Sequence, residues 1–80
     1  MTEDIDAQAE KFKEQGNTLF KSGGQAITEA IEAYSKAIAC KTPNKSHQST
    51  YYSNRAAAYL KQSLYSLTLC AHILSLFLYR

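Results

Sequence analysis

The sequence predicts an all-α protein. The 80 residues include only three glycines and one proline, while alanine, leucine, lysine, glutamine and glutamate are plentiful, and these residues favour helix over sheet. Hydrophobic residues make up 45% of the chain, which is typical of a folded domain, and most of them recur at helical spacing. A chain of this length forms one small domain with a limited core.

The first helix is expected from about Asp4 to Ser22, with Thr2 as its cap and acidic residues near the positive end of the helix dipole. Gly16 in mid-helix costs about 1 kcal/mol relative to alanine, so close contact with a neighbouring backbone is expected there. Gly23 and Gly24 end the helix. Five residues share its apolar face: Ala9, Phe12, Gly16, Leu19 and Phe20.

The second helix is expected from about Gln25 to Lys41, and it ends before Pro43 because proline disfavours helix in the residue that precedes it. The turn between the first two helices is so short that they must form an antiparallel pair. One apolar stripe follows the second helix at helical spacing: Ile27, Ala30, Ile31, Tyr34, Ala37 and Ile38.

The third helix is expected from Ser46, as its cap, to about Gln62. Its predicted inner face consists of Tyr52, Ala56, Tyr59 and Leu60. A fourth helix is expected after it, because residues 63–79 carry no formal charge and have apolar residues on nearly every side. Such a helix must be buried in protein, in a partner or in lipid. Its main stripe is Leu60, Leu64, Leu67, Ala71, Leu74 and Leu78.

The first two helices resemble one tetratricopeptide repeat, a unit of about 34 residues built from two antiparallel helices. Six residues occupy the signature positions of that repeat: Phe12, Gly16, Leu19, Ala30, Tyr34 and Ala37. Tyr52, Ala56 and Tyr59 match the first helix of a second repeat. The resemblance covers roughly residues 7 to 62. It divides the chain into a repeat region at 1–62 and an apolar segment at 63–80, and it indicates a sequence truncated or altered after about residue 62.

The resemblance also implies a binding function. One subclass of the family is co-chaperones that bind the C-terminal peptides of heat-shock chaperones through a carboxylate clamp. Lys13 and Asn17 match the first two clamp positions, and Asn54 matches the third. Lys13 and Asn17 stand four residues apart, on one helix face, and a lysine with two amides suits a carboxylate. The last two clamp residues of the family have no match here, so the clamp is expected to be partial and its binding weak.

Other kinds of chemistry are not expected. All seven acids lie in the first 32 residues, so no carboxylate is available beyond Glu32 to orient His47 or His72 as a catalytic base. The spacing of cysteines and histidines matches no structural zinc site, and no cofactor is expected. The bases of the second half are dispersed, which argues against nucleic acid as a partner. Without a secretory signal, Cys40 and Cys70 are expected to be reduced thiols in a cytoplasmic protein.

Residues 63–80 leave a second function open. A helix of 18 residues just spans a bilayer, and Lys61 and Arg80 flank the uncharged residues 63–79. Its serines, threonine and histidine make it only weakly hydrophobic. The alternative to the co-chaperone interpretation is therefore a membrane-associated or self-associating protein whose behaviour is dominated by the apolar segment.

Overall fold

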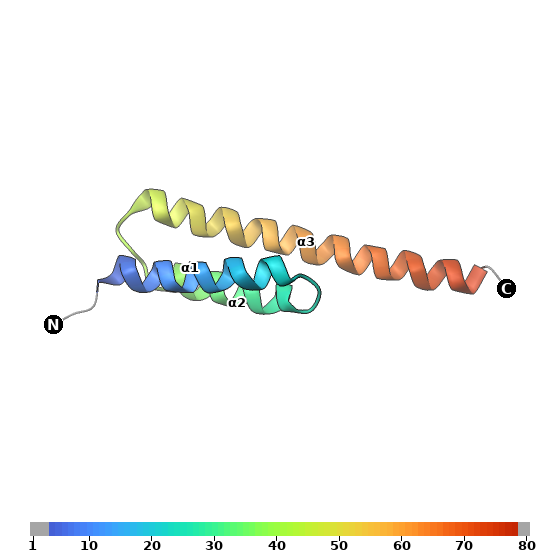
Figure 1. The fold of residues 1–80 in the computed structure, drawn as a ribbon. Helices are drawn as coiled ribbons and strands as arrows, with labels where there is room; N and C mark the ends of the chain where they lie inside the picture. Colours follow the sequence, from blue (N-terminus) through green and yellow to red (C-terminus); the bar gives the residue numbers. More distant parts are fainter. Residues whose placement is uncertain (1–3, 79–80) are drawn as a thin grey trace.

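The structure, a computed structural model, describes residues 4–78, with no side-chain detail at 72 and 76–78. Within this range the chain forms three helices, α1 (Ile5–Ser22), α2 (Ala26–Ala39) and α3 (Lys45–Leu78). α1 and α2 form an antiparallel hairpin, and α3 runs in the same direction as α1 (Figure 1). α2 packs against both other helices. The all-α prediction is confirmed, and the paired helices agree with a tetratricopeptide-type arrangement.

The ends of α1 follow from local hydrogen bonding. Asp4 caps the helix, because its side-chain oxygen accepts a hydrogen bond from the backbone N–H of Asp6 at 3.2 Å. The cap predicted at Thr2 lies outside the described residues. Gly23 and Gly24 end the helix with φ angles of 72° and 58°, which glycine adopts without steric cost. The predicted end of α1 is confirmed.

The core lies along α2. Ile27, Ala30, Ile31, Tyr34 and Ala37 are all buried, and Ile38 is partly buried, which confirms the predicted stripe. The close approach predicted at Gly16 is also present, but the neighbour is a ring rather than a backbone. A Cβ at this position would lie 2.4 Å from the nearest ring carbon of Tyr34. Glycine therefore makes room for one of the two tyrosines of the core.

α3 begins one residue earlier than predicted, and its cap differs. The Asn44 side-chain oxygen accepts a hydrogen bond from the backbone N–H of His47 at 3.1 Å, so Asn44 caps the helix and not Ser46. Thr42 fixes the approach to this cap. Its buried hydroxyl accepts from the backbone N–H of Asn44 at 3.2 Å and donates to the carboxylate of Asp6 on α1.

The inner face of α3 is not the predicted one. Tyr51 and Ala58 are fully buried, whereas Tyr52, Tyr59 and Leu60 are 49–63% exposed and Ala56 is exposed as well. The helix carries two apolar faces, and the hairpin covers the one that contains Tyr51 and Ala58.

The described residues contain no separate fourth helix, because α3 continues without a break from Lys45 to Leu78. No glycine or proline follows Asn44, so nothing ends the helix near Gln62. The Gln62 side chain still contacts the hairpin, donating to the hydroxyl of Thr28 at 3.0 Å. Beyond it α3 extends past the hairpin (Figure 1), and Leu64, Leu67, Leu69 and Leu74 are exposed instead of buried. The division of the chain at residue 62 remains a prediction.

A membrane anchor is not supported. Among the described residues, no helix combines the length and the apolar character needed to cross a membrane.

Candidate peptide-binding site

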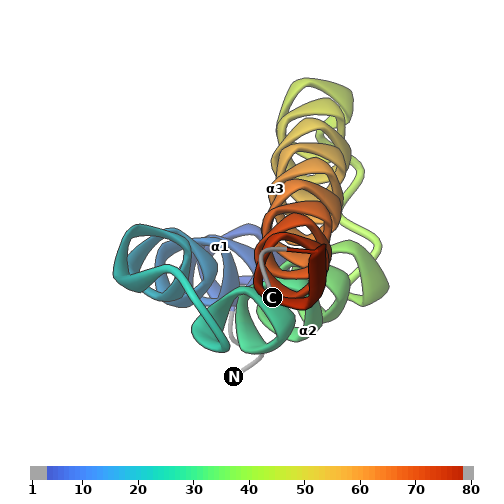
Figure 2. The same cartoon turned by 90° about the vertical axis from the view of Figure 1, so that its right-hand side faces the viewer.

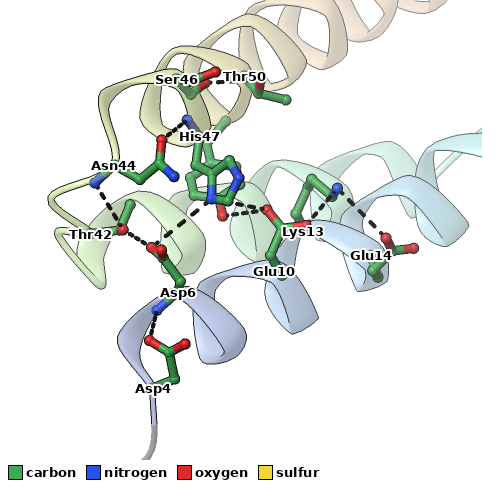
Figure 3. A network of polar contacts seen from close by, with 11 residues as sticks. Asp4, Asp6, Glu10, Lys13, Glu14, Thr42, Asn44, Ser46, His47 and Thr50 are labelled. Atoms are coloured by element: carbon green, nitrogen blue, oxygen red, sulfur yellow. Dashed lines mark hydrogen bonds and ion pairs between the residues drawn. The ribbon is translucent and has the colours of Figure 1, made fainter.

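Lys13, the predicted cation of the clamp, already has partners on its own helix. Its ammonium lies 2.8 Å from the Glu10 carboxylate and 3.6 Å from that of Glu14 (Figure 3). The hydrogen bond with Glu10 raises the pKa of Lys13, so the side chain stays positively charged. A ligand carboxylate would have to share this ammonium with Glu10 and Glu14.

Asn17 is held by the core. The buried hydroxyl of Tyr34, on α2, donates a hydrogen bond of 2.6 Å to the side-chain oxygen of Asn17. Burial raises the pKa of Tyr34, so the hydroxyl keeps its proton. Because the amide oxygen of Asn17 is occupied, its NH₂ group is left to donate to another molecule.

Asn54 lies on α3, one turn beyond Tyr51, and is half-buried. Among the described residues, nothing joins its side chain by a hydrogen bond to Lys13 or Asn17. The three predicted site residues are thus carried by two neighbouring helices, and they do not contact one another directly.

A polar cluster that the sequence did not indicate holds α1 and α3 together beside these residues. The buried hydroxyl of Tyr51 donates to Glu10 at 2.7 Å, and the His47 ring nitrogen Nδ1 lies 3.8 Å from the same carboxylate and 4.0 Å from that of Asp6. Figure 3 shows Glu10 between His47 and Lys13.

Glu10 is therefore bonded from both helices. Its hydrogen bonds with Lys13 and Tyr51 hold its pKa below the usual range, while burial and the bond to Glu10 raise the pKa of Tyr51. Glu10 remains ionised and Tyr51 remains a donor. Since α1 and α3 run in the same direction (Figure 1), Lys13 on α1 and Asn54 on α3 both lie about one helical turn beyond the bond between Glu10 and Tyr51.

Curated proteins similar to this chain include a co-chaperone and a tetratricopeptide repeat protein. The Hsp70/Hsp90 co-chaperone CNS1 of Saccharomyces cerevisiae is 42% identical over 57 residues, which are 71% of this chain and 14% of that protein. The tetratricopeptide repeat protein 4 homolog of Dictyostelium discoideum is 36% identical over 62 residues, or 78% of this chain and 16% of that protein. The DnaJ homolog subfamily C member 7 homolog of Schizosaccharomyces pombe is 44% identical over 62 residues, which are 78% of this chain and 12% of that protein.

The chain spans less than a fifth of the length of each of these relatives. No protein-family model matches it, and no solved structure matches it significantly. The similarities and the all-helical fold together support a protein of the tetratricopeptide repeat type.

Proposed function

We propose that this chain is a non-enzymatic, co-chaperone-like interaction module of the cytoplasm, which binds C-terminal peptides of heat-shock chaperones through Lys13, Asn17 and Asn54. The observation that carries the proposal is the bond between Tyr34 and Asn17. It leaves the NH₂ group of Asn17 as a donor, one helical turn from the ammonium of Lys13. The similarity to an Hsp70/Hsp90 co-chaperone supports chaperones as the class of partner.

Each residue has a distinct task in this mechanism. Lys13 supplies the positive charge, and Asn17 donates a directed hydrogen bond to the same terminal carboxylate. Asn54 donates to and accepts from the backbone of the peptide, because an amide side chain has both kinds of group. An extended peptide then lies between α1 and α3 with its last residue at α1.

We expect this binding to be weak. Glu10 and Glu14 compete for Lys13, and the two further cations of a complete clamp have no match in the sequence. Each missing charge-assisted hydrogen bond is worth about 1.5–3 kcal/mol, which moves a micromolar affinity towards the millimolar range.

The experiment that tests the proposal measures fluorescence anisotropy of a labelled peptide ending in Glu-Glu-Val-Asp with variants of the site. Asn17→Asp keeps an oxygen that accepts from Tyr34 but loses the NH₂ donor and adds a negative charge, so binding should disappear while the fold is retained. Asn54→Ala should also abolish binding. The control is Gln15→Ala, which removes an exposed amide from another face of α1. Unchanged affinity in both site variants would refute the clamp.

A further inference from the structure

α3 carries an apolar stripe that no other described part of the chain covers. Its members follow one another in alternating steps of four and three residues over about two heptads, and this average period of 3.5 aligns side chains along the contact line between two packed helices. The four leucines are each 55–65% exposed, and the alanine is exposed as well. We name this stripe the α3 seam: Leu60, Leu64, Leu67, Ala71 and Leu74.

The α3 seam faces away from the hairpin. Successive residues of a helix are about 100° apart, which places the centre of the seam roughly 180° around α3 from the buried residues Tyr51 and Ala58. Figure 2 shows α1 and α2 together on one side of α3, with its other side open. A partner helix along the seam therefore meets no obstruction from the hairpin.

The solvent-accessible area of the molecule indicates how much surface is available for a partner to cover. A compact monomer of 8.9 kDa is expected to expose about 4,800 Å², whereas this elongated molecule exposes 5965 Å² and measures 65 × 19 × 15 Å. The excess, about 1,200 Å², is larger than the ~800 Å² that each partner buries in a stable protein–protein interface, so the exposed surface is large enough for one.

The charges of the segment favour a second copy of this chain as the partner. From Gln62 to Ser75 the sequence contains no aspartate, glutamate, lysine or arginine. Two copies of the seam therefore meet without like-charge repulsion, and both present the same row of leucines. No charge is available there to select a partner of opposite sign.

We propose that the chain forms a homodimer in which the α3 seams of two copies pack against each other as a two-helix coiled coil. Each copy then covers the leucines of the other. Lys13 and Asn17 lie on α1 and take no part in the contact, so the dimer does not depend on the proposed peptide binding.

Sedimentation equilibrium of the full chain over a wide range of concentration tests the proposal. We expect a mass approaching twice 8.9 kDa as the concentration rises. Leu67→Glu should raise the dissociation constant on the order of 100-fold or more, because a carboxylate would be buried without a partner. The matched control is Ile73→Glu, which places the same charge at an exposed position of α3 outside the seam. Circular dichroism checks that both variants remain helical, and Leu67→Asn with Ile73→Asn repeats the comparison without charge.

Two results would overturn the homodimer. One is a monomer at every concentration, whether or not it binds phosphatidylcholine vesicles in a parallel pelleting assay; vesicle binding would assign the seam to lipid. The other is an association that Leu67→Glu and Ile73→Glu weaken equally, which would indicate unspecific aggregation of an apolar helix.

Discussion

Tyr34 connects the core of the hairpin to the proposed binding face. Its ring fills the space above Gly16, and its hydroxyl orients the amide of Asn17. Gly16 and Tyr34 therefore affect the proposed site as well as the stability of the hairpin. A shift of the Tyr34 ring would move the hydroxyl that holds Asn17.

Gly16→Ala tests the close contact with Tyr34. The added methyl would lie within 2.9 Å of three ring carbons, and overpacking of this kind costs about 1–3 kcal/mol. Replacing a mid-helix glycine by alanine stabilises the helix by about 1 kcal/mol. We therefore expect a net loss of about 1 kcal/mol in the free energy of unfolding. Urea unfolding followed by circular dichroism measures it, with Gln15→Ala as the control. A variant as stable as the parent chain would contradict the contact.

Glu14→Gln tests the competition for Lys13. The Glu14 carboxylate lies 3.6 Å from the ammonium and is 70% exposed, so its removal should tighten peptide binding about two- to threefold, as for other exposed ion pairs. The gain should vanish at high salt. Glu32→Gln makes the same change in net charge on α2 and should have a smaller effect. Equal gains in the two variants would show that only net charge matters.

The sequence predicted the close contact at Gly16, within the hairpin, but not the bond between Tyr34 and Asn17. Gly16 stood out because glycine is unfavourable in mid-helix, although its partner proved to be a ring. The bond between Tyr51 and Glu10 was missed, since the two residues are 41 positions apart and no pattern in the sequence links them. The roles of Lys13, Asn17 and Asn54 remain predictions.

At the scale of elements, Asn44→Ala tests the start of α3. Loss of the bond from its side chain to the His47 N–H should destabilise the chain by about 1 kcal/mol. Ser46→Ala is the matched control, because the sequence alone favoured Ser46 as the cap. Thermal unfolding by circular dichroism compares the two variants. A larger effect at Ser46 would show that α3 begins elsewhere.

The contact between α1 and α3 should depend on pH. Because the hydrogen bonds with Lys13 and Tyr51 lower the pKa of Glu10 below its ordinary value of 4.5, this contribution to stability is present above pH 4.5. It is lost as the pH falls through the lower pKa of the folded state. Urea unfolding at a series of pH values measures the loss. Glu10→Gln should make the free energy of unfolding less dependent on pH at acid pH, and Tyr51→Phe should do so in part. If both variants lose stability with acid as steeply as the parent chain, the contact with Glu10 is not the cause.

The elements differ in how far the sequence determines them. α1 and α2 each have one apolar face and clear end signals, and their predicted bounds are correct to within two residues. α3 has two apolar faces, one with Tyr51 and Ala58 and one with Tyr52 and Tyr59. Periodicity cannot decide which of them meets the hairpin. α3 also contains no glycine or proline near Gln62, so the change in composition there does not end the helix.

At the scale of the whole molecule, our proposals give this chain two separate surfaces for partners. The site on α1 and α3 is polar and takes a peptide in our proposal, while the α3 seam is apolar and faces away from the hairpin. Repeat proteins usually need about three units for stability, and residues 4–78 form one hairpin and one further helix. The free energy of unfolding should therefore rise with protein concentration if the seam dimerises.

The measurement that tests the central claim most directly compares two labelled peptides ending in Glu-Glu-Val-Asp, one with a free C-terminal carboxylate and one amidated, by fluorescence anisotropy at low salt. Our account predicts binding of the free acid, lost on amidation, because Lys13 and Asn17 recognise the terminal carboxylate itself. Equal binding of the two peptides, or no binding of either, would contradict it.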